Sequence, residues 1–465
     1  MSFVSLEFTR LLTAVLILLA ISRAAGWRKF ILLLASCVFY AYWDWRFLGL
    51  LVFVTVMDYY ISIWLVASRN ERTRKAMLFA SVVVNLSILG YFKYFNFFID
   101  SLNLILTRVG FNLPELQIIL PIGISFYIFE TLSYVIDVYR RHTEPADSLL
   151  DYAVFVTFFP RLVAGPIMRA SHFLPQLKRG IHFSRENFVV GAHLFAQGLL
   201  KKVVVADTLA LLSDTVYELP WVFSSAVVWL GVLSFAVQIY FDFSGYSDMA
   251  TGVARLLGFE LPVNFNLPFT SQSLTEFWQR WHISLSTWMR DYVYIPLGGN
   301  RHGAKRTNLN MLITMLIGGL WHGASWNFVV WGGMHGLALW AERIFSRGKQ
   351  PQGWSFPGAL LKALAVYLWV AVACVFFRSP SLQIAGEVFK KLFFISPVGA
   401  QWFFAPALFY VLIVLAGGFY LRIRHADGFL SDTRQPYVIP VIAAEYLFAF
   451  LFAAGGTSPF IYFQF

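Results

Sequence analysis

The chain has 465 residues, of which 58% are hydrophobic and 13% are charged, whereas about 25% of the residues of a typical soluble domain are charged. One globular core cannot bury so much apolar surface, so the composition excludes an ordinary soluble protein and indicates a polytopic membrane protein. The formal net charge of +11 fits cytoplasmic loops and anionic lipid headgroups, and the sequence shows no basic run interleaved with aromatic residues that would indicate a nucleic-acid partner.

Apolar segments long enough to cross a membrane, which takes about 20 residues, recur along the chain. The predicted spans are residues 6–24, 29–45, 47–67, 76–98, 118–139, 149–168, 187–212, 222–246, 309–331, 325–345, 359–377, 405–422 and 437–455. Two of them overlap and several are broken by Gly or Pro, so we expect about 11 crossings plus re-entrant or in-plane helices. This predicts an all-α polytopic integral membrane protein, with residues 1–465 as a single domain.

The first span predicts a transmembrane helix rather than a cleaved leader. Glu7 precedes Arg10, the only early cation, and a second apolar span follows directly. Segments 22–29 and 68–76 both carry several cations and lie two spans apart, so both can face the cytoplasm. We therefore expect the N-terminus on the outer side of the membrane.

Carboxylates and helix breakers occur inside three of the predicted spans. Glu130 and Asp137 are seven residues apart and so share a helix face, and the span at 149–168 is broken by proline and glycine. Asp242 and Asp248 lie near the end of the span at 222–246, about 120° apart on a helix. Intramembrane carboxylates can carry protons or cations, or can anchor neighbouring helices by hydrogen bonds; the structural role is slightly favoured.

Residues 258–308 are too polar to cross lipid freely and too aromatic for an ordinary solvated loop. Irregular backbone at membrane depth must be covered by protein or line water, so we predict an interfacial, partly buried segment. Within it, "EFWQRWHISLSTWMRDY" is interpreted as one helix, opened by Ser273 or Thr275. On such a helix Trp278, His282 and Ser286 share one face.

The same helix carries a second group of polar residues. Asp291 is nine residues after His282, so on a straight helix it points to the opposite side and forms no dyad with this histidine. Arg290 can bind a phosphate or a lipid headgroup. An amphipathic interfacial helix without catalytic residues is the alternative interpretation of this segment.

The stretch "GGLWHGASWNFVVWGGMHG", residues 318–336, places His322 inside an apolar span. An ionisable residue there indicates a functional site because its burial is costly. A neutral imidazole can act as a general base. Trp321 is adjacent and Trp326 follows one turn later, while the flanking glycines allow close approach of a backbone or a substrate.

The second histidine of this stretch is expected to have a different role. His335 is thirteen residues after His322, about 220° away on a continuous helix, so the two imidazoles would not share a face. We interpret His335 as a packing residue. The sequence has no Walker loop, HExxH or GxSxG motif, and its histidines are too dispersed to indicate a metal site.

Several long motifs resemble the membrane-bound O-acyltransferase family, and in particular its bacterial branch that acts in alginate O-acetylation. They are "FDFSGYSDMATG", "QSLTEFWQRWHISLSTWMRDYVYIPLGGNR" and "MLIGGLWHGASWNFVVWGGMHG", together with "LPIGISFYIFETLSYVIDVYR", "AGPIMR" and "SPFIYFQF". The resemblance covers nearly the whole chain. It implies that His322 matches the signature histidine of the family and His282 a second polar position, which is Asn or His.

The resemblance also implies a ring of helices around a central tunnel in the bacterial inner membrane, with a periplasmic N-terminus. The expected reaction passes acetyl from a cytosolic thioester, acetyl-CoA, for O-acetylation of an exported polysaccharide. No bound cofactor is expected. The expected partners are membrane lipids, the polysaccharide and a periplasmic acetyltransferase resembling SGNH hydrolases, since no SGNH-type Ser/Asp/His signature occurs in this chain.

Other functions remain open at this point. Alginate is the favoured acceptor, but related branches acetylate peptidoglycan or cellulose, or transfer D-alanine to teichoic acids. A transporter is an alternative from another class, in which the intramembrane carboxylates would line a path. It predicts inverted repeats, which are not detectable in the sequence.

Overall fold

The structure is a computed structural model that describes residues 1–345, 356–423, 435, 437–453 and 460–461. Within these residues it consists of helices and irregular segments, with one isolated bridge between Phe223 and Ala400 and no strand. This confirms the all-α fold class. Residues 1–195 and 249–262 form one compact unit, and residues 196–248 and 263–465 form a second; the single domain over the whole chain stays a prediction.

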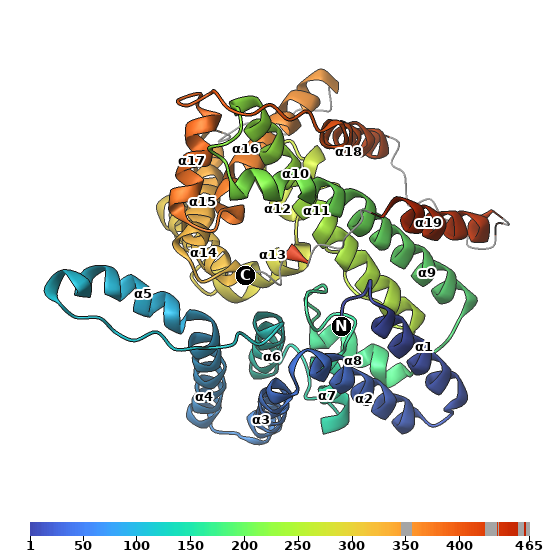
Figure 1. Ribbon diagram of the computed structural model, residues 1–465. Coiled ribbons are helices and arrows are strands. Elements are labelled where there is room, and N and C mark those ends of the chain that lie inside the picture. Colours follow the sequence, from blue (N-terminus) through green and yellow to red (C-terminus); the bar gives the residue numbers. More distant parts are fainter. Residues whose placement is uncertain (346–355, 424–434, 436, 454–459, 462–465) are drawn as a thin grey trace. The chain divides into compact units, whose positions relative to one another are not determined.

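The first unit consists largely of helices (Figure 1) and contains many buried aromatic side chains. Its helices are α1 (Leu6–Ile21), α2 (Ala25–Asp44), α3 (Leu48–Ala67), α4 (Glu71–Leu89), α5 (Phe95–Leu106), α6 (Ile124–Tyr139), α7 (Leu149–Thr157), α8 (Ala170–Arg179) and the first part of α9 (Arg185–Leu200). The rings of Phe158, Phe173 and Phe259 contact one another, with centroid distances of 5.0–5.1 Å. Aromatic pairs at this spacing stabilise a core beyond their burial alone.

The predicted break in the span at 149–168 is confirmed, and a buried ion pair holds it. Helix α7 ends at Thr157 and α8 begins at Ala170, with turns between them. Arg161 lies in these turns and forms a buried ion pair with Glu130 of α6. Glu130 also accepts a hydrogen bond of 3.1 Å from the backbone N–H of Met168. Both ends of the irregular segment are therefore tied to one carboxylate.

The second unit contains the helices that carry the predicted histidines. They are α10 (Asp207–Glu218), most of α11 (Ser225–Leu256), α12 (Leu274–Arg280), α13 (Ile283–Met289), α14 (Gly303–His322), α15 (Trp326–Phe345), α16 (Phe356–Arg378), α17 (Leu382–Leu392), α18 (Ala405–Ile423) and α19 (Val438–Phe452). A π-helical turn, η4 (Lys201–Ala206), precedes α10. The short connection between α14 and α15 makes them an antiparallel hairpin, and they lie side by side in Figure 1.

The hairpin is close-packed because two glycines face each other across it. A Cβ atom on Gly319 would overlap the carbonyl of Phe328, and one on Gly332 would overlap the carbonyl of Met315. Small residues at such positions let helix backbones approach within a membrane. The glycines of this stretch therefore bring α15 against the end of α14 that carries His322.

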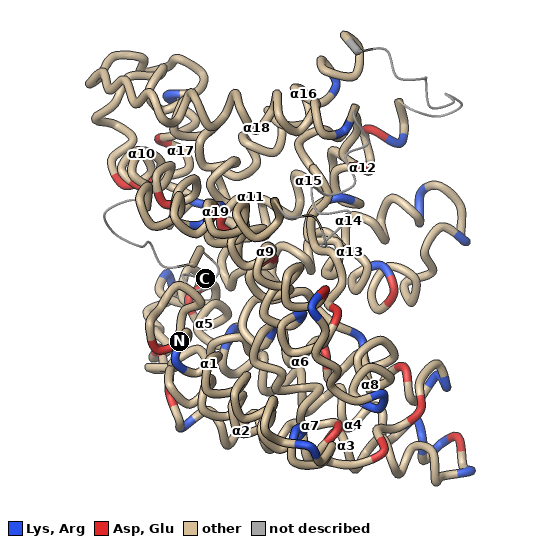
Figure 2. The backbone as a smooth tube through the Cα atoms, turned by 90° about the vertical axis from the view of Figure 1, so that its right-hand side faces the viewer, with Lys and Arg blue, Asp and Glu red and all other residues tan. Residues whose placement is uncertain are grey.

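Six helical segments within the described residues are long and apolar enough to span a membrane. They are Ala25–Ala67, Glu71–Val109, Arg185–Glu218, Ser225–Leu256, Pro357–Arg378 and Ala405–Ile423. The first joins two predicted spans, so the total of about 11 crossings stays a prediction. The Lys, Arg, Asp and Glu residues lie mostly near helix ends and in connecting segments, with long uncharged stretches of helix between them (Figure 2). The chain is a multi-pass membrane protein.

Candidate active site

The backbone turns sharply at His282, which corrects the single helix predicted across this segment. Helix α12, capped by Ser273 as predicted, ends at Arg280, and α13 begins at Ile283. His282 lies between them with φ 42° and ψ 54°, in the left-handed region. This conformation is unfavourable for most side chains but is tolerated more often by His. The turn carries the imidazole away from the face expected for a continuous helix.

Asn264 supports this turn through four hydrogen bonds. Its carbonyl accepts from the backbone N–H of Ile283 at 2.9 Å. Its side-chain oxygen accepts from the backbone N–H and the hydroxyl of Ser284, at 3.3 and 2.9 Å, and its amide nitrogen donates to the hydroxyl of Ser247 at 3.2 Å. The backbone N–H groups of Ile283 and Ser284, at the start of α13, thus find acceptors that the preceding turn of a continuous helix would have supplied. The bond to Ser247 links the turn to α11.

His282 and His322 come together in the second unit. Their ring centroids are 6.4 Å apart, and the side chain of each is buried, with 1% and 6% of its surface exposed. The Trp321 ring lies against both, at 5.8 Å from His282 and 5.0 Å from His322. Phe243 of α11 contacts His282 edge-on at 4.7 Å. The two histidines singled out in the sequence thus form one aromatic-walled cluster, which we call the histidine pair.

The imidazoles of His322 and His335 contact the same Trp331 ring, although a continuous helix would have kept them apart. Helix α14 ends at His322, with Gly323 as its C-cap, and α15 starts at Trp326. The Trp331 ring lies 5.1 Å from His322 and 4.9 Å from His335. The prediction that the two lie on different faces of one helix is therefore wrong, because the helix reverses between them. The packing role of His335 remains a prediction.

A small cavity lies beside His322, one member of the histidine pair, and beside His335. It has a volume of about 10 Å³, and its walls include His322, His335, Trp278, Trp331 and Phe377. This is room for about one water molecule. Trp278, predicted to share a face with His282, instead contacts the His335 ring at 5.1 Å. Little free volume therefore remains beside the His322 imidazole.

Burial also sets the protonation of His282, which lies outside the six apolar spans. Desolvation lowers the pKa of this imidazole from 6.5 to about 3. At neutral pH the ring is uncharged, with one nitrogen that donates and one that accepts a hydrogen bond. His282 can thus donate an N–H to a developing negative charge without itself carrying a charge.

Four other candidate residues, Ser286, Arg290, Asp291 and Trp326, make contacts outside the histidine pair or are exposed. Ser286 donates to the carbonyl of Trp281 at 3.2 Å. Arg290 and Asp291 pair with each other at 2.7 Å, with the arginine side chain largely exposed. Trp326, at the start of α15, is 47% exposed. None of these contacts includes an imidazole of the histidine pair.

The two carboxylates predicted near the end of the span at 222–246 each meet a lysine. The Asp242 carboxylate lies 2.7 Å from the ammonium of Lys202 and accepts the backbone N–H of Ile461 at 2.8 Å. Lys202 also pairs with Asp207 at 2.8 Å. Asp248 pairs with Lys201. These contacts fit an anchoring role, since each carboxylate ties α11 to the π-helical turn η4.

Sequence reasoning missed several residues that build this cluster. Trp331 precedes His335 by one helical turn, a spacing that places both on one face. Asn264 is one of two amides in the otherwise apolar segment "LPVNFNLPF", which is a weak signal of a buried anchor. Phe243 and Phe377 come from distant helices and carry no local signal.

Comparison with known proteins places the chain in a family. The model of the membrane-bound O-acyltransferase family matches residues 37–379, which include both members of the histidine pair. A probable alginate O-acetylase of Azotobacter vinelandii is 41% identical over 95% of each chain, and one of Pseudomonas aeruginosa is 47% identical over 79% of this chain and 70% of its own. A peptidoglycan O-acetyltransferase of Helicobacter pylori is 36% identical over 78% of this chain and 73% of its own.

The family match covers well over half of the chain and contains the whole segment from the Asn264 turn to the α14–α15 hairpin. Relatives above 40% identity align along most of their length. A buried, aromatic-walled imidazole pair suits acyl transfer, in which water must be kept from a reactive ester. The chain belongs to the membrane-bound O-acyltransferase family and is an O-acyltransferase.

Proposed function

We propose that this chain passes acetyl from cytosolic acetyl-CoA across the bacterial inner membrane, with its N-terminus on the periplasmic side, for O-acetylation of exported alginate. Relatives named as probable alginate O-acetylases, at 41–47% identity, support alginate over the other acceptors. The peptidoglycan O-acetyltransferase is 36% identical, and two teichoic acid D-alanyltransferases are 29% and 25% identical. The observation that carries the chemistry is the buried histidine pair, 6.4 Å between ring centroids.

The proposed reaction uses His322 as the base. Its imidazole takes the proton of an acceptor hydroxyl, which is a weak nucleophile until deprotonated. The oxygen attacks the thioester carbonyl, and a tetrahedral oxyanion forms. The carbon–sulfur bond then breaks, and the protonated His322 returns its proton to the departing thiolate. The products are an acetyl ester and the free thiol of coenzyme A.

His282 is proposed to stabilise the oxyanion. A neutral imidazole donates one N–H, and a fixed donor in a water-excluded site stabilises charge more strongly than the same group in water. Its pKa of about 3 keeps it in the donating, uncharged form at cytosolic pH. The left-handed turn and the Asn264 hydrogen bonds hold this ring in place before the acyl group arrives.

The final acceptor is proposed to be reached through a second protein. A periplasmic acetyltransferase resembling SGNH hydrolases would receive the acetyl group on its nucleophilic hydroxyl and esterify the polysaccharide. The hydroxyl that attacks the thioester would then belong to that partner or to a small carrier. The sequence shows no Ser/Asp/His signature of that class, which supports a division of the two steps between two chains.

Complementation tests the proposed function. In an alginate-producing strain that lacks its own membrane O-acetylase, expression of this chain is expected to restore acetyl esters on the exported alginate, measured by NMR of the purified polymer. An empty vector is the control. Unacetylated alginate together with newly acetylated peptidoglycan, with the chain present in the membrane, would contradict the acceptor assignment.

The role of His282 gives a separate prediction in that strain. His282→Ala is expected to lower the initial rate of ester formation by about 10²–10³-fold, because one oxyanion donor is lost. His282→Asn is expected to retain more of the rate, because its amide N–H can still donate. Since the pKa of the folded His282 is about 3, its ionisation adds no step between pH 5 and 8. Equal rates for the alanine and asparagine variants, or a wild-type step near pH 6 that disappears in His282→Asn, would contradict this role.

A further inference from the structure

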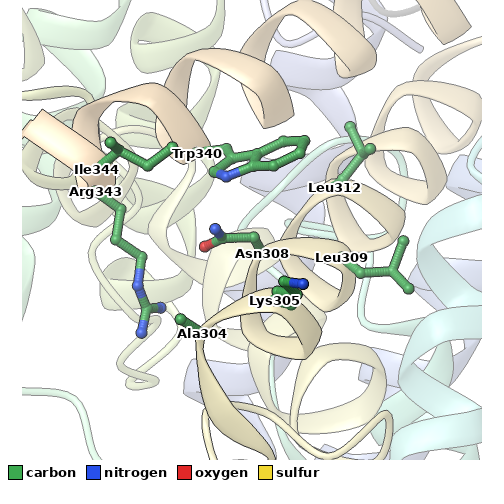
Figure 3. A pocket seen from close by; sticks show the side chains of 8 residues that line it. All are labelled: Ala304, Lys305, Asn308, Leu309, Leu312, Trp340, Arg343 and Ile344. Carbon is green, nitrogen blue, oxygen red and sulfur yellow. The ribbon is translucent and has the colours of Figure 1, made fainter.

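A groove lies at the end of the α14–α15 hairpin away from the turn at Gly323, and so apart from the histidine pair. Its volume is about 480 Å³, within the range of about 300–1,000 Å³ typical of small-molecule sites. It is lined by Ala304, Lys305, Asn308, Leu309, Leu312, Trp340, Arg343 and Ile344 (Figure 3). The first five follow one face of α14, and the other three come from the last turns of α15.

The groove carries two cations. Within the described part of the chain, neither Lys305 nor Arg343 forms an ion pair or a side-chain hydrogen bond. The nearest acid in the sequence, Glu342, is engaged elsewhere: its carboxylate accepts the backbone N–H groups of Leu274 and Thr275, at 2.6 and 3.1 Å. The charge of the groove is therefore positive, which favours an anionic ligand.

The start of α14 adds to this positive potential. The helix begins at Gly303, and no side chain caps it at His302. The first N–H groups of a helix have no partner within the helix and carry a partial positive charge. Such a terminus next to basic side chains is a common setting for phosphate.

Asn308 points into the groove between the two cations and the Trp340 ring (Figure 3). Only 8% of its surface is exposed, and its side-chain oxygen has no hydrogen-bond partner. A buried acceptor without a donor destabilises a protein, so such groups are almost always satisfied. A hydroxyl or N–H donor on a ligand would satisfy this oxygen, and an anionic group on the same ligand would pair with the two cations.

The outer edge of the groove is apolar and open. Leu309, Trp340 and Ile344 are 45%, 39% and 52% exposed. Trp side chains favour the boundary between headgroups and acyl chains, and Lys or Arg near helix ends reach towards headgroups. An acyl chain can lie along Leu309 and Ile344 while its headgroup enters between the cations.

We infer that this groove binds the headgroup of an anionic glycerophospholipid whose phosphodiester carries a free hydroxyl, as in phosphatidylglycerol. The phosphate lies between Lys305 and Arg343 at the start of α14, and a headgroup hydroxyl donates to the side-chain oxygen of Asn308. The exposed apolar edge accommodates an acyl chain. The site is separate from the acyl-transfer site and does not depend on the acceptor polymer.

Native mass spectrometry of the full chain tests this inference. The delipidated protein is titrated in detergent with phosphatidylglycerol or phosphatidylcholine, which has neither a net charge nor a headgroup donor. We expect one phosphatidylglycerol to bind with at least fivefold preference. The double variant Lys305→Gln/Arg343→Gln is expected to lose that preference, and Asn308→Leu to weaken it. Arg343→Lys should retain most of it because the charge is kept.

A neighbouring cation supplies the matched control. Arg306 is exposed and does not line the groove, so Arg306→Gln should bind as the wild type does. The proposed site would be overturned if the double variant preferred phosphatidylglycerol as strongly as the wild type does. It would also be overturned if Arg306→Gln lost as much of this preference as the double variant. A third arm adds inorganic phosphate or glycerol 3-phosphate. Displacement of the lipid by either at equal concentration would show a free-phosphate site and overturn the lipid assignment.

Discussion

Substituting His322 by alanine is expected to reduce acetyl esters on the exported polysaccharide to background in the complemented strain. Loss of a general base lowers the rate by about 10²–10⁴-fold. The measurement is the ester content per polymer by NMR, with the amounts of variant and wild-type chain in the membrane matched by immunoblot.

The matched control is His142→Ala, which removes an exposed histidine from the segment after α6. It should leave the ester content unchanged. His322→Gln is a second test of the chemistry, because its amide can fill similar space and form hydrogen bonds but cannot take a proton at neutral pH. Wild-type esters from either variant of His322 would refute its assignment as the base.

The second large effect concerns Lys202 and is a loss of stability. Its ammonium lies between the carboxylates of Asp207 and Asp242, and all three side chains are buried. Lys202→Met leaves two buried carboxylates without their cation, and removal of one partner from a buried ion pair destabilises a protein by about 3–5 kcal/mol. We expect a marked decrease in the fraction of chain that stays monodisperse in detergent after heating.

Neutralising the partners should reverse this loss. The triple variant Lys202→Met/Asp207→Asn/Asp242→Asn carries no unpaired charge and is expected to recover most of the thermal stability. Lys178→Met is the control, because Lys178 and its partner Asp147 form an exposed pair and exposed pairs contribute little. A Lys202→Met protein as stable as Lys178→Met would show that the cluster is not an anchor.

Much of the helical architecture was predictable because apolar length alone decides it. The predicted spans at 47–67 and 405–422 agree with α3 and α18 to within one residue at each end. The break after α7 followed from proline and glycine at 160–166. The buried Arg161–Glu130 pair was not predictable, since its partners come from different segments of the chain.

The site was predictable in its residues but not in its geometry. The cost of burying an imidazole identified His322 as a candidate. The turn at His282 was not predicted, because the spacing of hydrophobic residues does not reveal a helix break that hydrogen bonds from a distant segment stabilise. Asn264, eighteen positions earlier, supplies those bonds. Likewise, the contact of His335 with the Trp331 ring that also contacts His322 depends on close packing between α14 and α15, which the spacing of the two histidines along the chain does not show.

Acetyl transfer in sealed membrane vesicles tests the central claim most directly. Vesicles with the cytoplasmic face outward, prepared from the complemented strain with its periplasmic components enclosed, receive acetyl-CoA labelled in the acetyl group. We predict that vesicles with the wild-type chain accumulate labelled acetyl esters in the lumen, and that vesicles with matched amounts of His322→Ala do not. Equal labelling of the lumenal esters in the two preparations would contradict the account.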